Sequence, residues 1–409
     1  MTEKISSGLA DLARESALFP MEAPLKTHKG SRSLQIAVPL ETSLQENRVA
    51  LRPESVELLV NNGHEIIVET RAGEGSNYSD QEYSEAGAKI VYDRKEVFQS
   101  NIVLKVEPPT SYELEMMKPG ITLISAFQPG SQNTHFLQEL SRKRITAIGY
   151  EYLEDKVGGL PFVRAMSEIA GSSVMLIAAE YLSKTAEGGQ GVILGGVTGV
   201  APTNVVIIGA GTVGEYAARA AIGLGVDIQI FDNHIYKLRR LKHAIGHQVH
   251  TATFNHTALS KAVAEADVVI GAIRAEKGRN RIIVSEEMVA GMKAGSIVID
   301  VSIDQGGCIE TSNPTTLKNP VFTTYDVIHY CVPNIASRVP RTASMAISNI
   351  FTPILLTMSE VGGVEDMIFA SRGFMKGVYT YKGSVTNQYL ANKYGLPFKD
   401  LSLLMAARF

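Results

Sequence analysis

The sequence predicts an α/β protein with parallel sheets, built as two domains of which the second is inserted into the first. Strand-like and helix-like segments alternate from residue 34 onward, as in a parallel sheet whose crossover connections are helices. A second such series, over residues 201–326, opens with a glycine-rich turn between a strand and a helix. After Arg338 the pattern is helical again, and we expect this last segment to complete the first domain.

The glycine-rich turn is the most informative motif. An apolar run, residues 205–208, leads into Gly209, Gly211 and Gly214 in G-x-G-x-x-G spacing, and a pattern of small residues typical of a helix follows. In such a turn the first glycine permits the tight bend, the second lets the backbone approach a pyrophosphate, and the third lets helix and strand pack closely. The spacing therefore predicts a Rossmann-like dinucleotide-binding domain.

Two further features support this interpretation. The helix begins at Thr212 and Val213, where unpaired N–H groups and the positive end of the helix dipole would face the phosphates. The next apolar run ends in Asp232, about 20 residues after the turn, where an acid accepts hydrogen bonds from an adenosine ribose. A βαβ unit without a ligand is the alternative, and the complete context favours binding.

The first domain is expected over residues 34–161, after an extension at residues 1–33. In the extension, apolar residues from Ile5 to Leu18 follow a helical stripe that would pack either on its own domain or on a neighbouring subunit. We expect helices at residues 53–62, 80–88 and 135–143. We expect strands at residues 34–39, 64–70, 89–92, 101–106, 120–126 and 145–152.

The dinucleotide-binding domain is expected over residues 162–340 and the completion of the first domain over 341–409. A long helix from Ser167 to about Leu182 leads to the glycine motif. Further strands are expected at residues 268–273, 296–303 and 321–326, and a helix from Arg338 to about Met358. The remaining tail has the pattern of a hairpin followed by two short helices. A ligand site is expected in the cleft between the domains.

Composition narrows the function classes. The chain has 409 residues, 45% of them hydrophobic and 20% charged, which is ordinary for a soluble α/β protein. A net charge of -3 gives no indication of a nucleic-acid partner. There is no start typical of a secretory signal, and no uncharged apolar run reaches the roughly 20 residues that a membrane span needs. We therefore expect a cytoplasmic protein.

The sequence predicts no metal site. The histidines of HAIGHQVH, residues 243–250, include an i, i+4 pair, but Gly246 is expected to end the helix between them and no carboxylate ligand is near. Cys308 and Cys331 have no metal-type spacing, fit a reducing compartment, and are expected to be buried small residues.

Several motifs together resemble one family. They are ETSLQENRVALRPESV, GEGSNYSD, LKVEPP, RAMSEIAG, GGVTGVAPTNVVIIGAGTVG, IDVSIDQGGC and YCVPNIASRVPRTAS. Over about residues 34–358 the chain resembles alanine dehydrogenase and the related first domain of proton-translocating nicotinamide nucleotide transhydrogenase. MSEIAG and IDQGG favour the dehydrogenase, whereas Arg338 in NIASRVP is closer to the transhydrogenase pattern.

The resemblance implies a set of site residues. Arg48 would bind the substrate carboxylate, Lys105 would contact the carboxylate and carbonyl of pyruvate, and Asp304 would lie near the nicotinamide and the substrate. The family's contacts to the cofactor, NAD, map to Ser167, Asp232, Lys237 and Asn334. A homo-oligomer, often a hexamer, is also implied. From the residue types alone, Arg48 and Lys105 would be ordinary surface charges.

One position departs from the family. Where alanine dehydrogenases carry a catalytic histidine, this chain has Gln128, which can orient a substrate but cannot act as a general acid or base. The FQPGSQN segment around it approaches the corresponding transhydrogenase loop. If the chain keeps the chemistry, Asp304 or His329 is the expected substitute proton donor.

The function that follows is an NAD-dependent oxidoreductase that reversibly deaminates L-alanine to pyruvate and ammonium. Arg48 and Lys105 would hold the substrate, and Asp304 would orient the amine or a water and take part in proton transfer. Two alternatives stay open: an NAD(H)-binding module that passes a hydride to NADP on another, membrane-bound protein, and an NAD-binding protein without catalysis.

Overall fold

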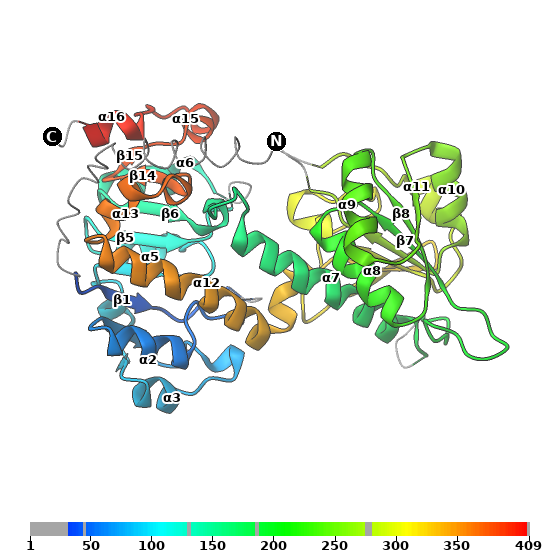
Figure 1. The fold of residues 1–409 in the computed structure, drawn as a ribbon, viewed down its shortest axis with the longest axis horizontal. Helices are drawn as coiled ribbons and strands as arrows, with labels where there is room; N and C mark the ends of the chain where they lie inside the picture. Colours follow the sequence, from blue (N-terminus) through cyan, green and yellow to red (C-terminus); the bar gives the residue numbers. More distant parts are fainter. Residues whose placement is uncertain (1–31, 44–45, 129–131, 185–187, 275–279, 407–409) are drawn as a thin grey trace, which may run out of the picture.

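The computed structural model describes residues 32–43, 46–128, 132–184, 188–274 and 280–406. Two lobes, each built around its own sheet, are joined by the long helices α7 (Pro161–Leu182) and α12 (Pro340–Glu360) (Figure 1). The first lobe takes strands from both ends of the chain, and the second lobe lies between them in the sequence. The predicted fold class is therefore confirmed. The helix predicted between Ile5 and Leu18 lies outside the described residues.

The first lobe has an eight-stranded sheet in the order β15-β14-β6-β5-β4-β1-β2-β3. Strands β1 to β6 are parallel, and the C-terminal hairpin β14–β15 adds antiparallel to the free edge of β6. The strands are β1 (Gln35–Val38), β2 (Glu65–Glu69), β3 (Lys89–Val91), β4 (Ile102–Leu104), β5 (Thr122–Ser125), β6 (Thr146–Gly149), β14 (Val378–Tyr381) and β15 (Ser384–Val385).

Local sequence signals set the start of several helices in this lobe. Pro53 stands in the first turn of α2, and Ser79 and Thr110 cap α3 and α5 with reciprocal capping boxes. The helices are α2 (Pro53–Asn61), α3 (Asp80–Glu85), α4 (Arg94–Val97), α5 (Ser111–Met116), α6 (Thr134–Arg142), α13 (Val364–Ala370), α14 (Arg372–Met375), α15 (Gln388–Tyr394) and α16 (Leu401–Ala406), with 3₁₀ turns η1 (Glu74–Ser76) and η2 (Tyr150–Tyr152).

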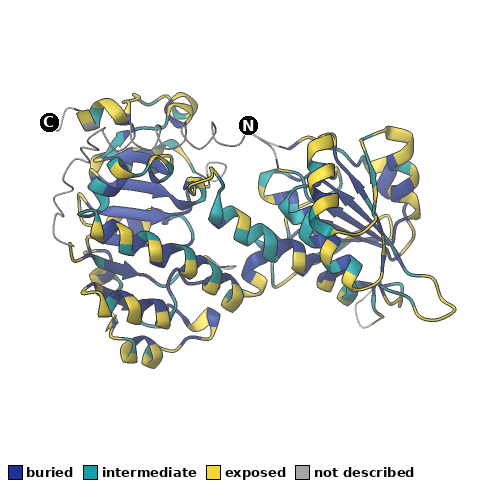
Figure 2. Ribbon diagram, viewed as in Figure 1, coloured by how far each residue is buried: buried dark blue, intermediate teal, exposed yellow. Residues whose placement is uncertain are grey.

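The second lobe has a seven-stranded sheet in the order β12-β13-β11-β10-β7-β8-β9, parallel except for the edge strand β12. Its strands are β7 (Asn204–Ile208), β8 (Asp227–Phe231), β9 (His250–Ala252), β10 (Val268–Gly271), β11 (Ile297–Asp300), β12 (Val321–Thr324) and β13 (Val327–Tyr330). Its helices are α8 (Thr212–Gly223), α9 (Ile235–Ile245), α10 (His256–Glu265) and α11 (Glu286–Ala290), with turns η3 (Val301–Gln305) and η4 (Ile335–Arg338). Both central sheets are buried, and the helices present their exposed faces outward (Figure 2).

The two connecting helices are long and largely apolar. By length and composition α7 and α12 could each cross a membrane, but 44% and 50% of their apolar windows are buried inside the fold. Helix α7 packs closely on α8, because Gly171 lets the backbone of Val213 approach: a Cβ on Gly171 would lie 2.5 Å from the Val213 carbonyl oxygen. Their apolar residues thus form part of the hydrophobic cores of the two lobes.

The elements differ from the sequence predictions mainly at their ends. The strands predicted at residues 101–106 and 296–303 end at Leu104 and Asp300, because the chain then turns to carry polar groups out of the sheet. The helix predicted from Ser167 begins at Pro161, a residue that fits the first helical turn. The predicted C-terminal hairpin and two short helices are present as β14, β15, α15 and α16.

Candidate active site

The candidate site lies at the carboxyl ends of the central strands of both sheets. In each sheet the strand order reverses between two neighbours, β1 and β4 in the first lobe and β7 and β10 in the second. Such reversals are where open parallel sheets bind ligands, because the connections leave in opposite directions. Glu41 follows β1, Lys105 and Glu107 follow β4, and the glycine-rich turn follows β7.

The glycine-rich turn has the geometry that phosphate binding requires. Gly209 has a φ of 113°, and a Cβ there would lie 2.5 Å from the carbonyl oxygen of Ala272. A Cβ on Gly214 would lie 2.0 Å from the carbonyl oxygen of Gly209, so only glycine lets α8 start this close to β7. A Cβ on Gly211, the N-cap of α8, would meet nothing within 4 Å. The space above Gly211 is thus open to a ligand, with the N–H groups of Thr212 and Val213 at the helix start.

Asp232 sits beside this turn, at the end of β8. Its carboxylate accepts hydrogen bonds from the backbone N–H of Ala210, at 2.9 Å, and of His234, at 2.7 Å. Burial acts to raise the pKa of Asp232, but these two N–H donors outweigh it and hold the pKa below its usual value. Lys237 lies within electrostatic reach of the same carboxylate. The Arg240 guanidinium donates to the carbonyl oxygen of Ala210, 3.2 Å away. The turn therefore carries one fixed negative charge where a ribose would lie.

Arg48 is buried and already paired. Its Nε donates to Glu46 Oε1 at 2.7 Å and its Nη2 to Glu46 Oε2 at 2.5 Å, so Glu46 occupies the bidentate fork. Nη1 donates to the thioether sulfur of Met166, a weak acceptor, at 3.3 Å. Arg48 thus presents Nη1, rather than the whole fork, to a further anion.

Lys105 is the second buried cation, with a side chain only 1% exposed. The strand predicted at residues 101–106 ends at Leu104, so Lys105 directly follows it. The Lys105 ammonium donates to Glu41 Oε2 at 2.8 Å and to Glu113 Oε1 at 3.2 Å. Burial acts to lower the pKa of Lys105, but the two carboxylates outweigh it and raise the pKa. Lys105 therefore stays charged and has one N–H left for a ligand.

Gln128 and Glu107 form a pair between two strand ends. The Gln128 side-chain amide donates to Glu107 Oε2 at 2.8 Å, and the backbone N–H of Gln128 donates to Glu151 Oε1 at 3.1 Å. Gln128 has a φ of 48°, a left-handed backbone conformation that residues other than glycine seldom adopt. Backbone strain of this kind gathers at functional sites, because the surroundings must hold it in place.

Asp304 and Asn334 connect the second lobe to the first. The backbone N–H of Asn334 donates to Asp304 Oδ1 at 3.2 Å, and the Asn334 side-chain amide donates to Glu46 Oε2 at 3.0 Å. Asn334 adopts a left-handed conformation, with a φ of 57°. A polar path thus runs from Asp304 through Asn334 and Glu46 to Arg48.

The site is strongly acidic for one expected to bind an anion. Around the cations Arg48, Arg94 and Lys105 lie the carboxyl groups of Glu41, Glu46, Glu69, Glu107, Glu113 and Asp304, and Glu151 adjoins them at Gln128. Asp304 reaches water but has protein around it, and this partial burial raises its pKa to about 6. Burial and the neighbouring Glu46 raise the pKa of Glu107 to about 8. Protons on these two groups would reduce the excess of negative charge.

Ser167 and His329 lie outside the hydrogen-bond network described above. Ser167 lies half-buried on α7, next to Met166. His329 is fully buried in β13, where one ring nitrogen faces Thr311 Oγ1 at 2.8 Å and the other the Val327 carbonyl oxygen at 2.9 Å. With both nitrogens occupied inside the sheet, His329 is not placed to exchange protons with a substrate. Burial lowers its pKa as well.

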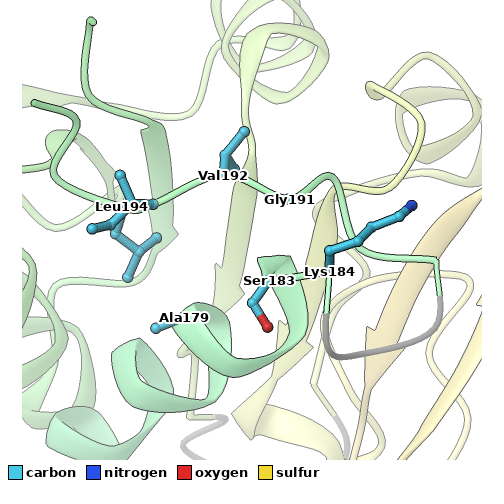
Figure 3. Close-up of a pocket in the computed structure, with 7 residues that line it drawn as sticks. Ala179, Ser183, Lys184, Gly191, Val192 and Leu194 are labelled. Atoms are coloured by element: carbon cyan, nitrogen blue, oxygen red, sulfur yellow. The ribbon is translucent and has the colours of Figure 1, made fainter.

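A surface pocket exists apart from this site. It lies at the end of α7 and is lined by Ala179, Ser183, Lys184 and residues 191–194 (Figure 3). None of the predicted site residues lines it.

Sequence reasoning missed the carboxylates around the two cations. Glu107 had a usable signal, since it follows the same apolar strand as Lys105 and precedes two prolines. Glu46, two residues before Arg48, had none, because only the local turn of the chain folds its carboxylate back onto the guanidinium.

Comparisons with known proteins agree with this arrangement. Residues 37–170 match the family "Alanine dehydrogenase/PNT, N-terminal domain" and residues 174–388 match "Alanine dehydrogenase/PNT, C-terminal domain". The chain is 38% identical to an alanine dehydrogenase of Bacillus subtilis over 89% of this chain and 95% of that protein. It is 37% identical to an alanine dehydrogenase of Mycolicibacterium smegmatis over 91% of this chain and 100% of that protein.

Solved structures give the same result. An L-alanine dehydrogenase structure superposes with a TM-score of 0.83 at 36% identity, covering 88% of this chain and 99% of that one. A transhydrogenase structure from Sinorhizobium meliloti superposes with a TM-score of 0.73 at 22% identity, covering 87% of this chain and 99% of that one, which is a likeness of fold.

Proposed function

Because the chain belongs to the alanine dehydrogenase/PNT family, we propose that it catalyses the reversible, NAD-dependent oxidative deamination of L-alanine to pyruvate and ammonium. One observation supports this most directly. Asp304 stands at the edge of the second sheet that also carries the glycine-rich turn, and it is joined to Arg48 of the first lobe through Asn334 and Glu46. Cofactor and substrate sites would thus lie face to face.

NAD, which accepts the hydride when bound, is proposed to lie along the second lobe. The open space above Gly211 fits a pyrophosphate, with Gly209 and Gly214 shaping the turn and the N–H groups of Thr212 and Val213 donating to it. Asp232 would accept hydrogen bonds from the adenosine ribose. Lys237, Ser167 and Asn334 are proposed as further contacts, on the family resemblance.

This assignment predicts a cofactor preference. The Asp232 carboxylate would stand where NADP carries its 2′-phosphate, and two like charges held side by side repel each other. NADH should therefore bind more tightly than NADPH, as dissociation constants from fluorescence titration would show. Equal or tighter binding of NADPH would mean that Asp232 does not contact the ribose.

The substrate is proposed to bind between Arg48 and Lys105. Nη1 of Arg48 and the third N–H of Lys105 are the donors that Glu46, Glu41 and Glu113 leave for its carboxylate and carbonyl oxygens. These donors would fix the substrate carbon for hydride transfer. Asp304 would orient the amine or a water, and Gln128 would help to position the substrate.

The assembly and location are proposed on the same family basis. We expect a cytoplasmic homo-oligomer, often a hexamer in this family, acting on small molecules and not on nucleic acid. The arm at residues 192–200 supports self-association, since Ile193, Val197 and Val200 are each more than 60% exposed. Ile193→Glu should lower the mass measured by light scattering if this arm lies between copies.

A panel of 2-oxo acids with ammonium and NADH, followed by the absorbance of the reduced nicotinamide, tests the activity. Pyruvate should be turned over fastest. Binding of NADH without turnover of any 2-oxo acid would indicate a non-catalytic NAD-binding protein. Hydride exchange with NADP on a membrane partner, again without amino-acid chemistry, would indicate a transhydrogenase-like module.

A further inference from the structure

We propose that Glu107 is the proton-transferring residue of this enzyme, in place of the histidine that the resemblance leads one to expect and that Gln128 replaces. The inference rests on the proposed function, since it needs a reaction that consumes and releases protons at the substrate. It is separate from the expected substitutes: Asp304 keeps its proposed role of orienting the amine or a water, and His329 lies inside the sheet with both ring nitrogens occupied.

The position of Glu107 is the first argument. Its carboxyl lies one hydrogen bond from Gln128, with 2.8 Å between Gln128 Nε2 and Glu107 Oε2. Oε1 lies 3.6 Å from Nη2 of Arg48, the cation proposed to hold the substrate. The Glu107 side chain is 17% exposed, whereas Glu46 beside it is 1% exposed. Glu107 is thus the carboxyl of this pair that can meet a substrate or a water.

The neighbours of Glu107 decide where the proton resides. Glu46 shares a hydrogen bond with Glu107 and is also held by both ends of the Arg48 fork. Two carboxyl groups in contact keep one proton between them, because both cannot ionise at little cost. Burial acts to raise the pKa of Glu46, but Arg48 outweighs it and lowers the pKa, so Glu46 carries the charge and Glu107 the proton.

The remaining neighbours favour the same state. Glu41 lies within electrostatic reach and adds to the rise in the pKa of Glu107, whereas Arg48 opposes it. Tyr150 donates its hydroxyl to the Val106 carbonyl oxygen, and its own pKa is raised well above the usual value, so it stays neutral. A carboxyl with a pKa of about 8 can release and take up a proton near neutral pH, which a general acid–base must do.

The proposed step can be written with balanced protons. In the deaminating direction the substrate starts as the neutral amine and Glu107 as the carboxylate. The hydrogen on Cα would leave with the electron pair of its bond as a hydride, which bound NAD would accept, and the substrate nitrogen and Cα would then form an iminium group. Water adds to the iminium carbon, and the Glu107 carboxylate takes one proton from that water. Glu107 then gives this proton to the nitrogen of the carbinolamine. As the C–N bond breaks and ammonia leaves, the hydroxyl proton passes to Glu107, giving pyruvate.

The first test measures the protonation of Glu107 directly and needs neither cofactor nor turnover. Infrared difference spectra of the full-length protein between about pH 6 and pH 10 should show a protonated carboxyl band that disappears with a midpoint near pH 8. The band should be absent from Glu107→Gln and present in Glu139→Gln, which alters a carboxylate of similar exposure, 18%, that is paired with Arg142 outside the site. A band that persists in Glu107→Gln would overturn the proposal.

The second test measures how the rate of the reaction depends on pH and on Glu107. Wild-type turnover of pyruvate, ammonium and NADH should fall as the pH rises above about 8, because the acid loses its proton. Glu107→Gln should lower kcat by roughly 100-fold or more and remove that dependence on pH, with NADH affinity and melting temperature kept. Glu107→Asp should keep part of the rate. Adding Gln128→His to Glu107→Gln should restore activity by supplying an imidazole at the neighbouring position.

The outcomes separate the two claims. Absence of turnover in the wild type with every 2-oxo acid overturns the proposed function, and the inference with it. Normal turnover that is unchanged in Glu107→Gln overturns the inference alone. The same holds if the pH dependence near 8 survives in Glu107→Gln or disappears only in Asp304→Asn.

Discussion

At the scale of single residues, the engagement of Arg48 by Glu46 has direct consequences for substitution. Lysine has one nitrogen and cannot satisfy both oxygens of Glu46 while reaching a substrate carboxylate. Arg48→Lys should therefore lower kcat/KM for pyruvate by roughly 10- to 100-fold, the cost of one lost charge-assisted hydrogen bond. The dissociation constant of NADH should change far less. Arg142→Lys, at an exposed ion pair, is the matched control. Wild-type kinetics in Arg48→Lys would place the substrate elsewhere.

A second prediction concerns Asp304 and the pH dependence of pyruvate binding. Its pKa is raised to about 6, so the folded protein holds this proton above the pH at which an unfolded chain releases it. Because a carboxylate repels an anion, the affinity of the NADH complex for pyruvate should fall as the pH rises through about 6. Isothermal titration without ammonium measures this, and Asp304→Asn should remove the dependence. An unchanged profile in Asp304→Asn would assign it to another group.

At this scale, the sequence could predict those site residues that directly follow a strand. Lys105, Asp304 and the glycines follow apolar runs, so each parallel sheet brings its own residues to its carboxyl edge: Lys105 in the first sheet, Asp304 and the glycines in the second. The partners of Lys105 and Arg48 could not be predicted, because Glu41, Glu46 and Glu113 reach them through loops and a helix start whose paths no periodicity encodes. His329 precedes YCVPN, yet its strand carries the ring into the sheet.

At the scale of an element, substitutions in the turn from β7 into α8 should distinguish effects on stability from effects on NADH binding. Gly211→Ala should keep the melting temperature, because the added methyl meets nothing within 4 Å, yet weaken NADH binding by filling the space proposed for the pyrophosphate. Gly214→Ala should lower both, since its Cβ would collide with the Gly209 carbonyl oxygen. Thermal unfolding with and without NADH measures the difference. Equal NADH affinity in wild type and Gly211→Ala would contradict the proposed phosphate position.

Most elements were predictable in kind but not in length. Buried parallel strands such as β4 and β11 are read from apolar runs, and those runs continue past the last paired residue. Short helices such as α4 and α5 bury too few residues to show a period, although Asp93 and Thr110 cap them. In the C-terminal tail, the turn residues between the two apolar runs predicted the hairpin that β14 and β15 form.

At the scale of the whole molecule, the last strands protect the first sheet. The edge of β6 pairs with β14, where the Gly149 N–H donates to the Gly377 carbonyl oxygen at 2.8 Å. Removing residues 376–409 should leave that edge open to pairing with other chains and cause aggregation, visible by light scattering. Removing only residues 401–409 keeps the edge paired and should cost much less. A soluble, monodisperse protein lacking residues 376–409 would contradict this role.

The interrupted first lobe also fixes an order of events during synthesis. A ribosome releases the complete second sheet before it has made β14 and β15, so the nascent chain can fold its dinucleotide-binding half while the other half still lacks its edge. Until β14 emerges, the edge of β6 is unpaired, and chaperones would need to shield it. The synthesis of β14 and β15 thus determines when the first sheet is complete and no longer prone to misassembly.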